Sequence, residues 1–261
     1  MDRIKMVLRY IKYWLSAKSK YSVHDPFVYR LLTEVIQSPK RFYAFEEIEG
    51  IRQMLEKQEG SIQVTDFGAG SQLDNKRERK IATIAQNAAK SRRLGELLFR
   101  LVDYAKPTYA LELGTSLGIS CLYQYSAARN AKWVTMEGCP ETAKLAKKVF
   151  TAYKADKVEV VVGDFSTTLD HTLAQFPHLD YAFFDGNHQK TATIEYFKKA
   201  LPKAKNGSLF IFDDIHWSKG MEEAWEEIKG DSSVSVTIDL FWIGLVFIAS
   251  DQEKAHFVLR S

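Results

Sequence analysis

From about residue 106 to the end of the chain, short apolar runs alternate with longer segments whose apolar residues recur every three or four positions. This alternation predicts β-strands that are each followed by an α-helix. The expected strands are 108–114, 132–138, 158–164, 179–186 and 207–214. The expected helices are 118–129, 140–155, 166–176, 190–202 and 221–230. Repeated strand–helix units predict an α/β fold with a doubly wound, mostly parallel sheet.

Two later apolar runs, 235–240 and 245–250, lie too close together for the crossover that parallel strands need. They predict an antiparallel pair, and residues 255–260 offer one extra strand. We therefore expect a seven-stranded Rossmann-like sheet with one antiparallel strand near the C-terminus. This α/β domain should occupy residues 106–261, after an N-terminal helical extension over residues 1–105.

The extension is expected to be helical because its apolar residues follow the helical period. Asp25 can cap a helix whose first residue is Pro26, a position that suits proline. Further helices are expected over 45–58 and 81–105, with Gly95 breaking the second one.

Residues 1–22 predict a basic amphipathic helix with an apolar stripe and lysines or arginines beside it. The stripe consists of Ile4, Val7, Leu8, Ile11, Trp14 and Leu15. We favour packing of this stripe against the protein's own domain. The alternative is a helix that lies on an anionic membrane surface, as a peripheral contact, or on a partner.

Composition narrows the class of protein. The chain has 261 residues, 46% of them hydrophobic and 26% charged, which is typical of an ordinary globular protein. Its net charge of +3 is too small to indicate a nucleic-acid binder. Its two cysteines, Cys121 and Cys139, are too few for a disulfide framework. The sequence contains no run of about 18 apolar residues, the length that a helix needs to span a bilayer. We expect a cytoplasmic protein, without a secretory signal.

Two glycine-rich loops compete as the place where a nucleotide binds. The loop "LELGTSLGIS" leads to a second strand that ends in Glu137, whose carboxylate can accept hydrogen bonds from both ribose hydroxyls. Gly114 and Gly118 allow the backbone of this loop to come close to a ligand. In open α/β sheets such ligands bind at the carboxyl ends of the strands. The sequence therefore favours this loop.

The other loop, "VTDFGAGS" from Val64 to Ser71, is followed by a charged run and no strand that ends in an acid. One interpretation is a turn or cap in which Asp66 and Ser71 bond to the backbone. The alternative is a lid loop over the cofactor or the acceptor.

Residues from about 110 to 248 resemble a class I S-adenosylmethionine-dependent methyltransferase, and are similar to its catechol and caffeoyl-CoA O-methyltransferase group. The resemblance rests on four motifs in the order of that group: "LELGTSLGIS", "VTMEGCPETAKLAKK", "DYAFFDGNH" and "FIFDDIHWSKG". It implies a Rossmann-like methyltransferase fold and S-adenosyl-L-methionine as the cofactor.

The resemblance also assigns roles in cofactor binding. It implies that Glu112, Gly114 and Ser120 line the methionine end of the cofactor. It places Asp164 and Phe165 beside the adenine. Asp164 can in addition cap the helix that follows it, and the alternative for Phe165 is core packing.

Acidic residues gather at two further strand ends. Asp185 ends the fourth strand, and Asp213 and Asp214 end the fifth. Adjacent strand ends lie about 5 Å apart, so these carboxylates can share a hard cation such as Mg²⁺ or Ca²⁺. The metal-dependent relatives carry an Asp-Asn pair where this chain has Asp-Asp. The alternative is that the pair caps the following segment and that Asp185 borders the cofactor.

His188 stands where the catechol enzymes carry a lysine general base. With Asp185, it forms the predicted catalytic pair. A histidine of ordinary pKa near 6.5 can accept a proton at neutral pH, and a bound cation beside it would lower that pKa. His216 is a second candidate base, whereas His24 is expected to be structural.

Three functions remain open at this stage. The first is metal-assisted O-methylation of a small-molecule hydroxyl, and Trp217, Phe241 and Trp242 indicate a planar or apolar acceptor. The second is a metal-independent methyltransferase for a lipid, an amine or RNA. The third is a non-catalytic cofactor-binding or membrane-associated module. A homodimer is a further expectation.

Overall fold

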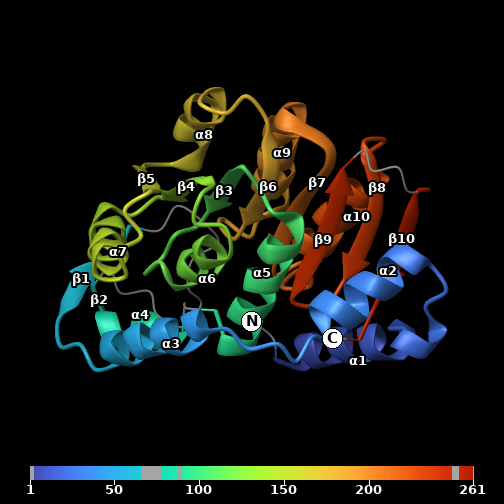
Figure 1. The fold of residues 1–261 in the computed structure, drawn as a ribbon, viewed down its shortest axis with the longest axis horizontal. Coiled ribbons are helices and arrows are strands. Elements are labelled where there is room, and N and C mark those ends of the chain that lie inside the picture. The colour runs from blue at the N-terminus through green and yellow to red at the C-terminus, as the bar shows by residue number, and fades with distance from the viewer. Residues whose placement is uncertain (1–2, 66–77, 88–89, 249–252, 261) are drawn as a thin grey trace. The chain divides into compact units, whose positions relative to one another are not determined.

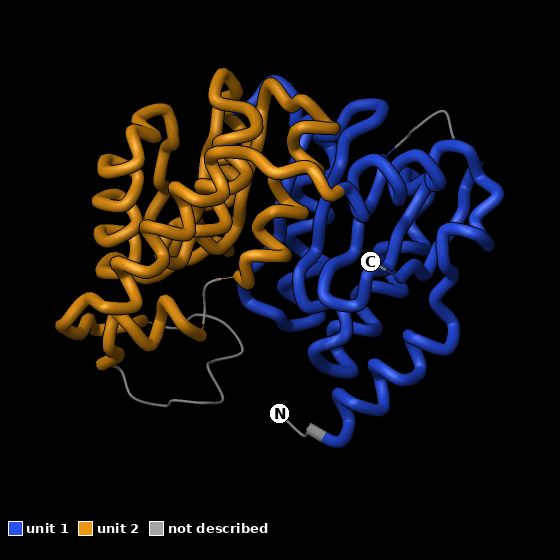
Figure 2. The backbone as a smooth tube through the Cα atoms, turned by 60° about the horizontal axis from the view of Figure 1, so that its bottom comes forward, with its two compact units in different colours: residues 1–38, 176–261 blue, residues 39–175 orange. Residues whose placement is uncertain are grey.

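The computed structural model describes residues 3–65, 78–87, 90–248 and 253–260. The chain divides into two compact units, drawn in blue and orange in Figure 2. Unit 1 comprises Met1–Ser38 and Phe176–Ser261, and unit 2 comprises Pro39–Gln175.

Within the described residues, eight strands form the main sheet in the order β10-β8-β9-β7-β6-β3-β4-β5 (Figure 1). Strand β9 is antiparallel to both of its neighbours, whereas the pairs β10–β8, β7–β6, β3–β4 and β4–β5 are parallel. The doubly wound, mostly parallel sheet with one antiparallel strand near the C-terminus is therefore confirmed. The expected number of seven strands is corrected to eight, because Ala255–Val258 pairs with β8.

Unit 2 contains three parallel strands and most of the helices that follow the expected pattern. Its strands are β3 (Tyr109–Leu113), β4 (Lys132–Glu137) and β5 (Val158–Val162). Its later helices are α5 (Arg92–Ala105), α6 (Ile119–Ala127), α7 (Pro140–Ala152) and α8 (Phe165–Ala174). Strands β3 and β4 are buried along most of their length. Their continuous apolar runs are typical of strands covered on both faces.

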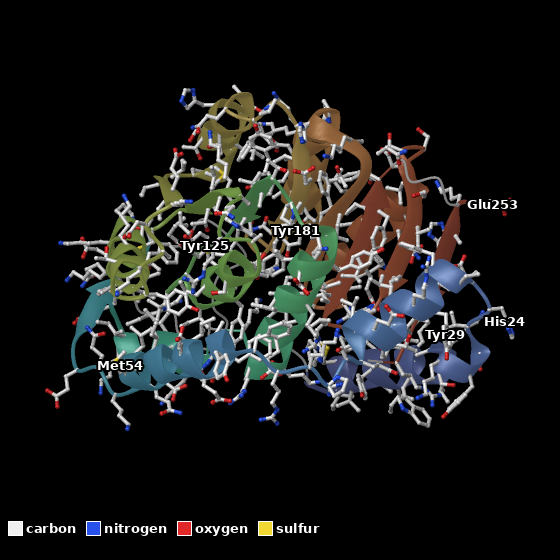
Figure 3. The ribbon with its side chains drawn as sticks, in the orientation of Figure 1. His24, Tyr29, Met54, Tyr125, Tyr181 and Glu253 are labelled. Atoms are coloured by element: carbon white, nitrogen blue, oxygen red, sulfur yellow. The ribbon has the colours of Figure 1, made fainter. Side chains whose placement is uncertain are left out.

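Unit 1 contains the remaining five strands of the sheet. They are β6 (Leu179–Phe184), β7 (Ala204–Asp213), β8 (Val234–Asp239), β9 (Ile243–Ile248) and β10 (Ala255–Val258). The accompanying helices are α9 (Lys190–Ala200), the 3-10 turn Leu201–Lys203 and α10 (Lys219–Gly230). Every residue of β6, β8 and β9 is buried, among them Tyr181 (Figure 3). These strands form the core of the unit.

The N-terminal part of the chain is largely helical, as predicted. Its elements are α1 (Arg3–Ser16), a 3-10 turn (Lys20–Ser22), α2 (Pro26–Arg30), a π-helix (Leu31–Ile36), α3 (Tyr43–Glu56) and α4 (Ile81–Asn87). The Asp25 carboxylate accepts from the Val28 amide at 2.8 Å, which confirms the predicted cap. A short antiparallel pair, β1 (Ser61–Gln63) and β2 (Glu78–Lys80), was not predicted.

The predicted break at Gly95 is wrong. Gly95 lies inside α5, and the chain leaves the helical path before Ser91, which caps this helix. A Cβ at Gly95 would lie 2.5 Å from the ring of Tyr123 on α6. The glycine therefore serves the close approach of two helices, which sequence periodicity does not report.

The predicted packing of the N-terminal apolar stripe is also wrong. The helix α1 does pack on the rest of unit 1, but it does so through Met6 and Tyr13, with Ala17 just beyond its end. These residues form a buried cluster with Phe241. All six residues of the predicted stripe are exposed, by 48% to 71% of their surface. Met6 and Tyr13 occupy the inner face of the helix instead.

Within the described ranges, none of the helices combines the length and the apolar character that crossing a bilayer requires.

We expect Gly95→Ala to lower the free energy of unfolding by about 1 kcal/mol or more, because the added methyl group overpacks a buried ring. Urea unfolding measures the effect. The matched control is Gly50→Ala on α3, where a Cβ would meet nothing within 4 Å. That control should gain roughly 0.5–1 kcal/mol from helix propensity. A Gly95 variant that is equally stabilised would contradict the packing argument.

Candidate functional site

The loop after β3 turns back toward the end of β4. Three of its residues have left-handed backbone conformations, Gly114, Ser116 and Gly118, with φ of 102°, 49° and 85°. The amides of Gly114 and Thr115 both donate to the Met136 carbonyl, at 2.9 and 3.0 Å. The loop is thereby fixed between the end of β4 and the start of α6.

Gly118 is required for two reasons. Its positive φ strains any residue with a side chain. A Cβ there would also lie 2.6 Å from the buried ring of Phe150 on α7. The close approach of this loop to a ligand, which the sequence predicts, thus coincides with a close approach to α7.

Glu137 connects the loops that follow β3 and β4. Its Oε2 accepts from the Ser116 amide at 2.8 Å, and its Oε1 accepts from the Cys139 amide at 2.9 Å. The carboxylate is only partly buried. Both of its oxygens are therefore held in fixed positions at the carboxyl end of β4, where the sequence predicts a ribose-binding group.

Glu112 and Ser120 lie beneath the glycine loop. Glu112 is completely buried, and its Oε1 accepts from the Ser120 hydroxyl at 2.8 Å and from the side-chain Nε2 of Gln124 at 2.7 Å. Its Oε2 accepts from the Thr135 hydroxyl at 2.6 Å. The structure thus brings Glu112 and Ser120 into contact, while their predicted place at the methionine end of the cofactor stays a prediction. They contact each other and their neighbours in the interior.

Asp164 and Phe165 follow β5. The Asp164 carboxylate accepts from the amide and the hydroxyl of Ser166, both at 2.8 Å, so the predicted cap of α8 is confirmed. Phe165 is buried. The Gly163 amide donates to the Glu137 carbonyl at 2.9 Å. The loop after β5 is therefore attached to the same end of β4.

In unit 1, three of the predicted catalytic and metal-binding residues converge. Ligand atoms of Asp185, His188 and Asp213 lie within 4.8 Å of one another. His188 Nε2 lies 3.6 Å from Asp185 Oδ1 and 4.0 Å from Asp214 Oδ2. Asp213 is almost completely buried, at 2% exposed. The structure adds His188 to the acidic set, whereas the sequence predicted a cation site of three aspartates.

The backbone at this cluster adopts unusual conformations. Asn187 and Asp214 have φ of 60° and 54°, and the Asp214 amide donates to the Trp242 carbonyl at 2.7 Å. A left-handed backbone conformation at a residue other than glycine costs free energy, and such residues are frequent at functional sites. Among the described residues and atoms, the buried Oδ1 of Asn187 has no hydrogen-bond partner. The segment 185–188 is thus held in a strained arrangement beside the carboxylates.

His216, the second candidate base, is engaged elsewhere. Its Nε2 lies 2.7 Å from Asp239 Oδ2, and its Nδ1 lies 3.4 Å from Glu222 Oε1. Burial lowers the pKa of His216, but its contacts with the two carboxylates outweigh burial and raise it overall. Arg9 of α1 binds Glu222 at 3.0 Å. The histidine therefore connects α1 and α10 to the sheet.

The donor set of the cluster fits a divalent cation. Two carboxylates and one imidazole are typical ligands of Mn²⁺, Fe²⁺ or Zn²⁺, whereas Mg²⁺ and Ca²⁺ prefer oxygen ligands. Asp213 is buried, and a cation would compensate its charge there.

The segment Asp66–Ser71, the centre of the rejected glycine loop, lies outside the described residues, so its two interpretations stay open. Thr65, the residue directly before this segment, donates its backbone amide to the sulfur of Cys139 at 3.4 Å. Cys139 is the residue whose own amide binds Glu137. The sequence offered no indication of this contact.

Comparison with known proteins supports the sequence resemblance. Residues 111–215 match the family model of a methyltransferase domain. No curated protein sequence matches the chain.

Solved structures share the fold at low sequence identity. The O-methyltransferase from Bacillus cereus in complex with SAH is 18% identical over 80% of this chain and 92% of its own, with a TM-score of 0.57. SAH-bound PaMTH1 from Podospora anserina is 15% identical over 87% and 97%, with a TM-score of 0.60. TomG from Streptomyces achromogenes, an O-methyltransferase of tomaymycin synthesis in complex with SAM, is 20% identical over 85% and 94%, with a TM-score of 0.57. Residues 111–215 thus match a methyltransferase-domain model, and the solved structures share the fold that the sequence predicted.

Proposed function

We propose that this protein is an S-adenosylmethionine-dependent methyltransferase that transfers a methyl group to a hydroxyl of a small molecule. One observation carries the proposal: the Glu137 carboxylate is held by two backbone amides at the end of β4, directly beside a left-handed glycine loop. A carboxylate in this place can accept hydrogen bonds from a ribose diol. The methyltransferase-domain match and relatives crystallised with SAH or SAM support the same cofactor.

The residues of unit 2 divide into contacting and positioning groups under this proposal. Glu137 would bind the ribose hydroxyls, and the backbone of Gly114 and Gly118 would admit the methionine end. Asp164 and Phe165 would contact the adenine. Glu112 and Ser120 would hold the glycine loop in position and would not contact the cofactor, because the carboxylate oxygens of Glu112 already accept hydrogen bonds from buried protein donors.

The chemistry requires a proton acceptor. The cofactor supplies an electrophilic methyl group, so the protein has only to orient the acceptor oxygen and remove its proton. Orientation contributes on the order of 7–11 kcal/mol to such reactions, and a general base adds roughly 10²–10⁴-fold. We assign the base to His188 Nε2, because the imidazolium formed there would lie beside the carboxylates of Asp185 and Asp214.

A divalent cation is the alternative role of the same cluster. Asp185, His188 and Asp213 would hold it, and its charge would lower the pKa of a bound hydroxyl. Asp214 would then assist from beside His188. A histidine that ligates a metal through Nε2 does not accept a proton at that atom, so the two roles exclude each other.

The acceptor proposed for this site is planar or apolar. Trp242 is half-exposed, packs edge-on against Phe241 at 4.8 Å, and bonds through its carbonyl to the Asp214 amide. An exposed indole beside the cluster can stack on an aromatic or apolar hydroxyl compound. A lipid-dissolved acceptor is a second candidate, which the exposed face of α1 favours. Peripheral membrane contact, a homodimer, a cytoplasmic location and a catalytic domain over residues 106–261 remain parts of the proposal.

We expect Glu137→Ala to weaken S-adenosylmethionine binding at least about tenfold, because charged hydrogen bonds of this kind contribute roughly 1.5–3 kcal/mol. Isothermal calorimetry on the folded variants measures this. Glu141→Ala, an exposed acid at the start of the adjacent helix, is the control and should bind normally. If a folded Glu137 variant binds the cofactor with full affinity, the proposed ribose site is wrong.

We expect His188→Gln to lower kcat by roughly 10²–10⁴-fold while cofactor affinity stays unchanged. His171→Gln, at an exposed position of α8, is the matched control. EDTA separates the two roles of His188. Activity that EDTA removes and Mn²⁺ restores would assign His188 to a metal, and full activity of the His188 variant would exclude both roles.

We expect Glu112 to make stability depend on pH. Burial, only partly offset by its hydrogen bonds, raises the pKa of Glu112 from 4.5 to about 6. The folded protein therefore binds this proton more tightly than the unfolded chain, and stability should rise as the pH falls through 6. From about pH 7.5 to about pH 5, wild type should gain about 1 kcal/mol that Glu112→Gln does not gain. Urea unfolding at both pH values measures the difference, and parallel behaviour of the two proteins would refute it.

A further inference from the structure

The apolar stripe of helix α1 faces away from the rest of unit 1, on which the helix packs. We propose that this outer stripe, Ile4, Val7, Leu8, Ile11, Trp14 and Leu15, binds the surface of an anionic lipid bilayer, with the helix axis lying in the plane of the membrane. Each of these side chains is exposed by 48% or more, and Ile4 and Leu15 by 71%. A contiguous apolar surface of this kind marks an interaction site.

The exposure does not result from a detached helix. On its inner face, Tyr13 packs against Phe241 with ring centroids 5.2 Å apart, and its hydroxyl donates to the Leu259 carbonyl. Arg9 binds Glu222 of α10 at 3.0 Å. Directly after the helix, Lys18 pairs with the end of β10 through backbone hydrogen bonds to Val258 and from Arg260. The helix is therefore anchored with its stripe outward.

The charge of α1 indicates what kind of surface the stripe binds. The sequence of α1, RIKMVLRYIKYWLS, contains four basic residues and no acidic one. Lys5 and Lys12 are exposed and lie beside the stripe at helical spacing, and Lys18 is exposed just beyond the helix. Apolar residues bordered by lysines are typical of helices that lie on anionic membranes, where each basic residue adds attraction.

The aromatic residues of α1 agree with an interfacial position. Trp14 and Tyr10 are each about half-exposed, on the border opposite the lysines. The Arg260 guanidinium lies 4.4 Å from the centre of the Trp14 ring. Tryptophan and tyrosine are enriched at the boundary between lipid and water, because their rings are apolar and their polar groups reach water.

A second copy of the chain fits the stripe less well. Two such helices packed face to face would bring Lys5 and Lys12 of each copy together, four lysines in all, and α1 contains no acidic residue to compensate them. A lipid surface rich in negative headgroups attracts the same residues. We therefore commit to the bilayer.

The consequence for catalysis rests on the proposed function. Phe241, which packs on Tyr10 and Tyr13, is followed by Trp242, whose carbonyl holds the Asp214 amide. If α1 binds the membrane, the end of unit 1 that carries Asp185, His188 and Asp213 would lie close to the lipid. The acceptor would then be a hydroxyl compound that partitions into the bilayer.

Co-sedimentation of the full-length protein with vesicles tests the docking. Phosphatidylcholine vesicles with and without phosphatidylglycerol are used in the absence of cofactor, so the result is independent of methyl transfer. We expect binding to the anionic vesicles only. Ile11→Glu/Leu15→Glu should lower the partition coefficient about tenfold or more, because charged groups would enter the apolar boundary.

Two further variants complete the test. Tyr43→Glu/Met54→Glu changes two exposed apolar residues of α3 and should bind like wild type (Met54 is labelled in Figure 3). Lys5→Glu/Lys12→Glu keeps the stripe and should lose at least about tenfold on anionic vesicles, from roughly fivefold for each basic charge near the surface. Because all these positions are exposed, the melting temperatures should match wild type.

Three outcomes would overturn the proposal. The first is sedimentation that is equal with anionic and neutral vesicles, or absent with both. The second is full binding by a folded Ile11→Glu/Leu15→Glu protein. The third is a dimer in sedimentation equilibrium that this variant dissociates, without vesicle binding by either protein, which would assign the stripe to a second copy. If docking holds but no methyl transfer to any hydroxyl is found, the proposed function fails alone.

Discussion

The end of β4 holds the candidate cofactor site together. The Met136 carbonyl accepts from the amides of Gly114 and Thr115, and the Glu137 carbonyl accepts from Gly163. The Glu137 side chain accepts from two further loop amides. Loops from three neighbouring strands thus converge on two consecutive residues. Since buried backbone amides must be paired, the three loops have little freedom to separate.

The carboxylate of Glu112 and the carboxylates beside His188 differ in how their negative charge is compensated. In unit 2, the completely buried Glu112 is surrounded by neutral donors, which stabilise its charge only in part, and its pKa rises. In unit 1, several carboxylates lie close together at two strand ends, and His188 is the group beside them that can become positive. Positive charge there, either a bound cation or the imidazolium that forms when His188 accepts a proton, would compensate these carboxylates, which is why proton transfer and metal binding compete for one residue.

The sequence predicted the parts of the fold that depend on local pattern. The alternation of strands and helices, the turn at Gly118 and the cap at Asp25 each follow from residues near one another in the chain. Gly95 could not be interpreted in the same way, because its reason is the ring of Tyr123 on another helix. The site shows the same division. Strand-end acids were found from their positions, and His188 was paired with Asp185. The closeness of His188 to Asp213 was not predicted, because it depends on the left-handed turn at Asn187.

The orientation of α1 shows most clearly why amphipathicity does not determine which face is buried. The apolar stripe would gain more from burial per unit area, but the inner face carries groups that also form specific polar contacts. Tyr13 both packs and donates a hydrogen bond, and Arg9 pairs with Glu222, itself beside His216. Turning the helix over would leave these partners unpaired in a partly buried place, which costs roughly 1–3 kcal/mol for each buried polar group. The apolar face is left outward, and an outward apolar face is most simply explained by a surface that it meets.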